Sequence, residues 1–205
     1  KMKKHEFNAK GMACPLPVVQ TKKLLAEYDV VETTVDNFIA TENLTKLAEQ
    51  LNYDIDVKKI SDEEYIVTIS NSVTDKENSV KEVTEEKTQV IKAQDDSYIV
   101  VVNKQIMGHG SEELGKKLMK AFLYTLTEQE VLPKKIIFYN GGVLLADKNQ
   151  SHVLEELKVL QENGVEIMSC GACIDYYKVD LAIGSTSNMY FIVEEMRAAD
   201  RVVRP

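Results

Sequence analysis

The chain has 205 residues and a formal net charge of −8, with 44% hydrophobic and 28% charged residues. This composition is typical of a globular protein that buries a core, and it excludes a disordered chain. A net acidic chain lacks the basic footprint of nucleic-acid-binding proteins, so we expect no nucleic-acid partner. No apolar run is long enough to span a bilayer and no apolar signal region follows the basic start, so we expect a cytoplasmic protein without a membrane partner.

The first 70 residues alternate between strand and helix patterns. Expected strands cover residues 4–8, 31–35, 53–57 and 65–69, and expected helices cover residues 15–28 and 44–51. From Leu44 to Leu51, apolar residues recur at i, i+3, i+4 and i+7, which gives the second helix one apolar face. Helices with single apolar faces and half-buried strands predict an N-terminal two-layer βαβαββ sandwich over residues 1–70.

Residues 71–96 separate two differently patterned regions. They are polar and net acidic, and the stretch 71–79 has almost nothing to bury. This composition predicts a flexible, self-repelling acidic linker. The alternative is a solvated helix that packs loosely on one domain.

The strands expected after the linker have a different character. Residues 98–102 and 136–139 are continuous apolar runs, as in strands that are covered on both faces. Expected helices cover residues 112–126, 152–162 and 188–199, and shorter expected strands cover residues 165–168, 181–183 and 201–203. Repeated βα units predict a C-terminal doubly wound, mostly parallel α/β sheet over residues 97–205, with ligands bound at the carboxyl ends of its strands.

Cys14 lies between the first expected strand and the first expected helix, in the sequence GMACPLP. We expect Pro15 at the first helical position and Cys14 at the N-cap, with Pro17 in the first turn. The positive end of the helix dipole at that point favours thiolate over thiol and predicts a lowered pKa for Cys14. A nucleophile or a persulfide carrier requires a thiolate, whereas the alternative is a buried and inert cysteine.

The Cys-Pro-Leu-Pro sequence, followed by Asp36 and Asn37 at the end of the second strand, resembles the TusA/SirA family of sulfur carriers. The resemblance covers about residues 2–70 and includes the order of the elements. It implies that Cys14 receives sulfur as a persulfide and passes it on, with Pro15, Pro17 and Asp36 as parts of the motif. The motif leaves open whether the cargo is sulfur or selenium.

Cys170 and Cys173 form a Cys-x-x-Cys pair after the expected strand 165–168, which places both thiols in a loop at the carboxyl end of the sheet. This spacing allows a tight disulfide, and we expect Gly171 to supply a positive φ angle for the turn. A helix that starts near Cys173 would make it the more acidic thiol and the attacker, with Cys170 as the resolving thiol. The pair could also supply half of a zinc site, but the sequence has no second pair, so we expect no metal.

The C-terminal region resembles the DsrE/DsrF-like family, in which a loop cysteine moves sulfur, and Cys173 best matches that cysteine. Basic residues that follow this cysteine in the sulfur-relay members are absent here. The order of the two domains, with Cys-Gly-x-Cys in the second, resembles the YedF proteins, which are described as sulfurtransferase-like and linked to selenium metabolism. The resemblance also implies that a homo-oligomer can form through the C-terminal domain.

Two glycine-containing loops are weaker candidates for a site. Gly108, His109 and Gly110 precede the helix 112–126, and free N–H groups there could bind an anion, although a plain turn is the alternative. Asn140 and Gly141 end the strand 136–139 and could shape a pocket around Cys173, or form a permissive turn.

These features predict a sulfur or selenium carrier that acts through a persulfide-type intermediate on Cys14, with the thiols of Cys170 and Cys173 receiving or releasing the cargo. Exchange between thiolates and persulfides requires no cofactor, and the expected partners are donor and acceptor proteins, including a cysteine desulfurase as donor. The linker would raise the effective concentration of one thiol near the other. The alternatives are a non-enzymatic thiol–disulfide redox or regulatory module and a protein-binding adaptor. Whether the chain turns over as an enzyme stays open.

Overall fold

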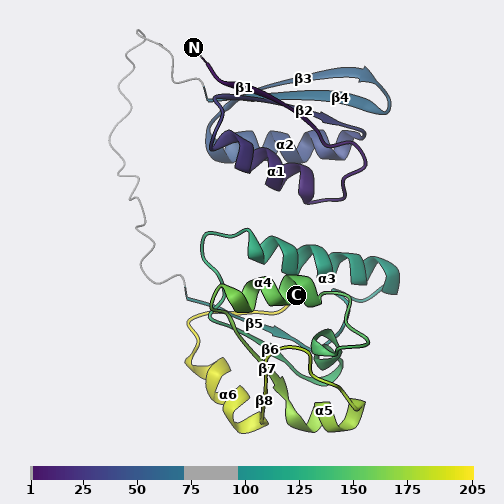
Figure 1. The fold of residues 1–205 in the computed structure, drawn as a ribbon, viewed down its shortest axis with the longest axis vertical. Helices are drawn as coiled ribbons and strands as arrows, with labels where there is room; N and C mark the ends of the chain where they lie inside the picture. Colours follow the sequence, from purple (N-terminus) through teal and green to yellow (C-terminus); the bar gives the residue numbers. More distant parts are fainter. Residues whose placement is uncertain (1, 72–96) are drawn as a thin grey trace. The chain divides into compact units, whose positions relative to one another are not determined.

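The structure is a computed structural model that describes residues 2–71 and 97–205 (Figure 1). The chain divides into two compact units, Lys1–Thr88 and Gln89–Pro205. Apart from its first residue, the predicted linker over residues 71–96 lies outside the described residues, and it stays a prediction. The two units are described separately.

The first unit contains the predicted order of elements. These are β1 Lys4–Asn8, α1 Leu16–Leu25, β2 Val30–Val35, α2 Phe38–Leu51, β3 Asp54–Ser61 and β4 Glu64–Ser70. The strands form one sheet in the order β1-β2-β4-β3, in which β1 and β2 are parallel and the other pairs are antiparallel. Both helices cover the same face of this sheet (Figure 1). The predicted two-layer βαβαββ sandwich is therefore confirmed.

The core of the first unit follows the sequence pattern that predicted it. Alternate residues of β2 and β4 are buried. On α2, Leu44, Leu47 and Ala48 are buried and pack with these strands. The helix begins earlier than expected, at Phe38, because the Asn37 side chain caps it by accepting from the Ala40 N–H at 2.9 Å.

The second unit is an α/β domain with a single parallel sheet among its described residues. Its elements are β5 Ile99–Val102, α3 Glu112–Thr127, β6 Lys135–Phe138, the 3₁₀ helix η1 Asn140–Ala146, α4 Leu154–Glu162, β7 Glu166–Cys170, α5 Gly171–Tyr177, β8 Ser185–Ser187, α6 Met189–Ala198 and β9 Val202–Val203. The strand order is β8-β7-β6-β5-β9, and all pairs are parallel. The predicted parallel α/β sheet is confirmed.

Two apolar clusters cover the two faces of this sheet. Val100 and Val102 of β5 pack with α3 and α4, whereas Ile99 and Val101 pack with Ile192 of α6. Because both faces are covered, every residue of β5 is buried. The continuous apolar runs therefore gave the correct prediction of central strands.

One predicted strand of the second unit is wrong. Residues 181–183 do not join the sheet: Leu181 forms an isolated antiparallel bridge with Asp147. The edge strand beside β7 is instead β8, which follows Gly184, a glycine with a φ of +77°. The expected helix 188–199 is α6, and the Asn188 side chain caps it by accepting from the Phe191 N–H at 3.2 Å.

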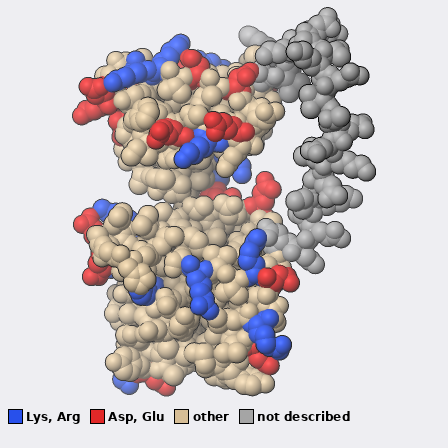
Figure 2. Space-filling view, turned by 180° about the vertical axis from the view of Figure 1, so that it is seen from behind, with Lys and Arg blue, Asp and Glu red and all other residues tan. Residues whose placement is uncertain are grey.

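Among the described residues, no helix is both long and apolar enough to cross a membrane. Figure 2 shows basic and acidic side chains interspersed over both units on the face that it presents.

Candidate thiol sites

Cys14 is exposed and carries a free thiol. It lies one residue further from α1 than predicted, because Pro15 is the N-cap and Leu16 the first helical residue. The Pro15 carbonyl accepts the first helical hydrogen bonds, from Val18 N–H at 3.0 Å and Val19 N–H at 3.1 Å. Pro17 lies in the first turn as expected. The exposed position excludes the alternative of a buried cysteine.

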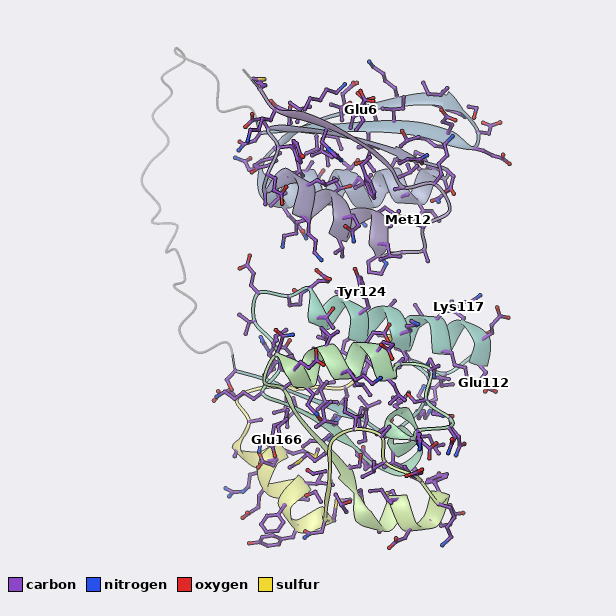
Figure 3. All side chains as sticks on the ribbon, viewed as in Figure 1. Glu6, Met12, Glu112, Lys117, Tyr124 and Glu166 are labelled. Atoms are coloured by element: carbon purple, nitrogen blue, oxygen red, sulfur yellow. The ribbon has the colours of Figure 1, made fainter. Side chains whose placement is uncertain are left out.

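The surroundings of Cys14 are mostly apolar. A shallow hollow is lined by residues from the loop before α1 and from the starts of α1 and α2, namely Met12, Cys14, Pro15, Pro17, Val18, Asn37, Ile39, Ala40 and Asn43. Met12 belongs to that loop (Figure 3). At the start of α2, Phe38 and Ile39 are 60% and 66% exposed. The thiol therefore opens beside accessible apolar side chains of the kind that a protein partner can cover.

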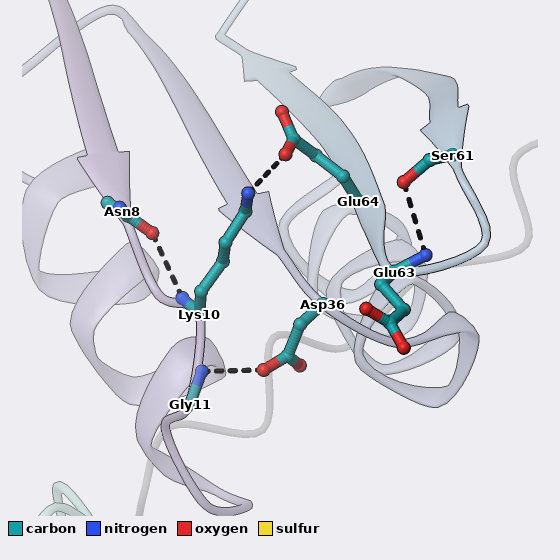
Figure 4. A network of polar contacts seen from close by, with 7 residues as sticks. All are labelled: Asn8, Lys10, Gly11, Asp36, Ser61, Glu63 and Glu64. Carbon is teal, nitrogen blue, oxygen red and sulfur yellow. Dashed lines mark hydrogen bonds and ion pairs between the residues drawn. The ribbon is translucent and has the colours of Figure 1, made fainter.

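Asp36 fixes the loop that carries Cys14 (Figure 4). Its carboxylate accepts from the Gly11 N–H at 2.6 Å and from the Asn37 side-chain amide at 2.7 Å. The Gly11 N–H, followed by the Asn37 amide, holds the pKa of Asp36 below its usual range. Gly11 has a φ of +75°, a conformation that side chains disfavour. Nearby, Lys10 forms an ion pair with Glu64 of β4.

Cys170 and Cys173 do not lie in a loop, which corrects the prediction. Cys170 is the last residue of β7 and the N-cap of α5, and Cys173 lies in the first turn of that helix. Helix and strand join directly, so no loop residues remain between them. Cys170 is only 3% exposed, whereas Cys173 is partly exposed, and both carry free thiols.

Burial and two polar neighbours set the direction of the pKa shift of Cys173. The backbone N–H of Asn140 donates to Cys173 Sγ at 3.1 Å. Burial, followed by the hydrogen-bonding Cys170 thiol, raises the pKa of Cys173, and the Asn140 N–H opposes this shift. The structure therefore contradicts the expectation of an acidic Cys173, because burial and the Cys170 thiol raise its pKa.

Gly171 also has a different role from the one expected. It does not have a positive φ. A Cβ at this position would lie 3.1 Å from Thr186 Cγ2 and 3.3 Å from the Ser187 carbonyl oxygen. The glycine therefore permits close packing of α5 against β8.

Cys173 opens into an aromatic hollow. Its lining comes from the end of β6 and from α5, namely Tyr139, Asn140, Ala172, Cys173, Tyr176 and Tyr177. The Tyr177 hydroxyl donates to Asn140 Oδ1 at 2.8 Å, which connects α5 to η1. The sequence reasoning did not single out Tyr177, although its position four residues after Cys173 in a helix could have indicated it. Of the two residues predicted to shape a pocket around Cys173, Asn140 lines this hollow and Gly141 does not.

The glycine-containing loop at residues 108–110 contributes less to this site. Gly108, His109 and Gly110 are exposed. Of these three, Gly110 lines a neighbouring hollow, together with Asn140, Gly141 and Tyr177. The Ser111 side chain caps α3 by accepting from the Leu114 N–H at 3.2 Å. Anion binding at this loop stays a prediction.

The two units match the models of two known protein families. The model of the DsrE/DsrF-like family matches residues 96–205, which is more than half of the chain. The chain belongs to the DsrE/DsrF-like family. The model of sulfurtransferase TusA matches residues 5–71, so a TusA domain precedes the DsrE/DsrF-like domain. The two family matches support a general role in sulfur transfer.

Solved structures resemble the TusA domain and the DsrE/DsrF-like domain separately. A SirA-like protein from Desulfitobacterium hafniense is 37% identical, covers 32% of this chain and 95% of its own, and has a TM-score of 0.31. The YchN protein from E. coli is 21% identical, covers 53% of this chain and 99% of its own, and has a TM-score of 0.42. A protein of unknown function from Methanobacterium thermoautotrophicum is 16% identical, covers 53% of this chain and 98% of its own, and has a TM-score of 0.41. No curated protein matches the chain.

Metal-ligating side chains do not cluster around these thiols in the part of the chain that the structure describes. Over residues 2–71 and 97–205, no three His, Cys, Asp or Glu side chains are grouped to hold a metal ion. Cys173 interacts with the Cys170 thiol and accepts from the Asn140 N–H.

Iodoacetamide at neutral pH is expected to modify Cys14 first, Cys173 more slowly and Cys170 last. Cys14 is exposed, Cys173 is partly buried with a raised pKa, and Cys170 is buried. A buried thiol reacts only after local opening, and each ~1.4 kcal/mol of opening free energy slows its reaction about tenfold. Peptide mass mapping over time measures the order, and alkylation in denaturant should equalise the three rates. Faster modification of Cys170 than of Cys14 would contradict this prediction.

Proposed function

We propose that the chain is a sulfur or selenium carrier in which Cys14 of the TusA domain holds the cargo as a persulfide or its selenium analogue. The observation that carries this proposal is the exposed Cys14 thiol on a loop fixed by Asp36 and surrounded by accessible apolar residues. An exposed thiol on a fixed loop is accessible to a protein donor and to a protein acceptor. The DsrE/DsrF-like domain offers Cys173 as the second thiol, in a hollow open to the surface.

The transfer step requires no further reactant. The Cys173 thiolate attacks the outer sulfur of the persulfide on Cys14, and a new S–S bond forms at Cys173. The S–S bond at Cys14 breaks, and its electron pair leaves with the Cys14 sulfur as a thiolate. Cys173 then carries the persulfide, with the outer sulfur and its proton transferred together. Both cysteines belong to one chain, which raises their effective concentration for this exchange.

Sulfur loading by a cysteine desulfurase and cysteine tests this function. We expect intact-protein mass spectrometry to show the addition of one sulfur atom, mapped to Cys14, and its loss after treatment with a thiol reductant. Cys14→Ser should abolish this loading, because the acceptor thiol is removed. Cys173→Ser is the matched control, because it should retain loading at Cys14 but show no persulfide in the DsrE/DsrF-like domain. Unchanged uptake in Cys14→Ser would disprove the carrier function of Cys14.

The finer assignments extend the same proposal. The order of domains and the Cys-Gly-x-Cys sequence favour membership of the YedF proteins and a role in selenium metabolism. A loading reaction with a selenium donor in place of cysteine, read by mass, compares selenium with sulfur uptake. A cytoplasmic location, protein donors and acceptors, and a homo-oligomer formed through the C-terminal domain stay predictions.

A second candidate function is a thiol–disulfide redox or regulatory module. The observation that favours it is the contact between the Cys170 and Cys173 thiols. Here Cys173, the more exposed thiol, would react first, and Cys170 would resolve the product. A chain that forms this disulfide reversibly but takes up no sulfur on Cys14 would support the module over the carrier.

A further inference from the structure

Asn140 has an unusual backbone conformation directly beside Cys173. It is the first residue of η1 and follows Tyr139, whose backbone is extended. Its φ is +49°, in the left-handed region that few residues other than glycine adopt. Asparagine tolerates this region better than most side chains. In this conformation its N–H donates to Cys173 Sγ at 3.1 Å.

Both sides of Asn140 are fixed by neighbouring elements. On the sheet side, the Tyr139 N–H donates to the Val102 carbonyl at 3.1 Å, and the Gly142 N–H donates to the Tyr139 carbonyl at 3.0 Å. On the helix side, the Asn140 side chain accepts from the Tyr177 hydroxyl at 2.8 Å. The N–H is therefore oriented toward the sulfur before any reaction begins, which is the arrangement that stabilises developing charge most effectively.

We propose that Asn140 is the anion-stabilising residue of Cys173, with its backbone N–H holding the negative charge of the sulfur during transfer. The inference rests on the proposed function and adds the group that assists it. Charge resides on Cys173 Sγ twice: when Cys173 attacks a persulfide as a thiolate, and when it is released as a thiolate after its own outer sulfur has moved on. The N–H contacts the sulfur at both moments.

The other groups around Cys173 do not replace this N–H. The titratable side chains near the sulfur are Cys170 from β7, which acts on its pKa, and the tyrosines that line the same hollow, Tyr139, Tyr176 and Tyr177. No Lys, Arg or His is among the described residues that line the hollow. Burial disfavours the Cys173 thiolate, so a single oriented donor has a large share in its stabilisation.

The test is the pH dependence of Cys173 alkylation in the full chain, measured by iodoacetamide and peptide mass mapping. Asn140→Gly retains the N–H and the left-handed conformation, whereas Asn140→Ala retains the N–H but disfavours that conformation. Both remove the bond to Tyr177, which Tyr177→Phe also removes while leaving Asn140 in place. Comparison of Asn140→Ala with Asn140→Gly therefore isolates the orientation of the N–H.

We expect the alkylation midpoint of Asn140→Ala to lie ~1 pH unit above that of Asn140→Gly, as for the loss of one hydrogen bond to a charged group. Tyr177→Phe should behave like Asn140→Gly. Coincident midpoints for Asn140→Ala and Asn140→Gly overturn the proposal, and so does a Tyr177→Phe midpoint as high as that of Asn140→Ala. Continued protection of Cys170 from iodoacetamide shows that a variant is folded. If Asn140→Ala does not fold, Asn140→Ser takes its place in the comparison. The readout needs no sulfur transfer, so it is independent of a failure of the proposed function.

Discussion

Gly142→Ala is expected to destabilise the DsrE/DsrF-like domain by about 3 kcal/mol, at the upper end of the usual cost of overpacking. A Cβ on Gly142 would lie 2.2 Å from the Val102 carbonyl oxygen and 2.8 Å from its carbon. Both atoms belong to the backbone of β5, a strand that is buried along its whole length. The clash cannot be relieved by a side-chain rotation, so η1 or β5 must move.

Gly141→Ala is the matched control for this prediction. A Cβ there would meet nothing closer than the Asn103 carbonyl oxygen at 3.6 Å, and Gly141 has no positive φ. We expect it to be neutral or to stabilise by about 0.4–1 kcal/mol, because alanine restricts the unfolded chain. Alkylation of the buried Cys170 in increasing urea reports the unfolding of this domain alone. Equal midpoints for the two variants would show that η1 does not pack on β5 in this way.

The sequence predicted the elements whose burial leaves a regular pattern. Burial on both faces makes β5 and β6 continuous apolar runs, and burial on one face makes buried and half-buried residues alternate in β2. The expected helix end at residue 162 agrees with α4, which Gly164 follows with a φ of +91° while the Val165 N–H donates to the Leu160 carbonyl at 3.0 Å.

The edge strand β8 was missed for a physical reason. Its sequence, Ser185–Ser187, is short and polar, and it is paired on one side only, with β7. It therefore has no apolar alternation to detect. The neighbouring Leu181 and Ile183 do alternate, but they satisfy their burial outside the sheet, against the main apolar cluster of this domain.

The sequence indicated candidate residues but not their contacts. The Cys-x-x-Cys spacing indicated Cys170 and Cys173, the proline-framed helix start indicated Cys14, and the resemblance to the TusA/SirA family added Asp36. The hydrogen bond from Asn140 to Cys173 joins residues 33 positions apart, and it depends on a left-handed backbone and on the pairing of β6 with β7. The raised pKa of Cys173 likewise results from burial and from its contact with Cys170, which helix position alone does not reveal.

Mild oxidation is expected to form a disulfide between Cys170 and Cys173 within one chain. The two thiols already contact each other, one at the end of β7 and the other in the first turn of α5. Closing a ring of so few residues costs little chain entropy, so no large movement should be needed. After treatment with a thiol oxidant, intact mass under non-reducing conditions should show the loss of two hydrogens per chain.

Serine variants test whether the loss of two hydrogens comes from a disulfide between Cys170 and Cys173. Cys170→Ser and Cys173→Ser should each abolish it completely, because either removes one of the two sulfurs. Cys14→Ser is the matched control and should retain it, since Cys14 lies in the TusA domain and takes no part in the bond. In the oxidised wild-type chain, Cys173 should resist iodoacetamide while Cys14 still reacts. Loss of two hydrogens that disappears in Cys14→Ser, or that occurs only between chains, would contradict the pairing and would leave Cys173 as a single thiol beside the Asn140 N–H.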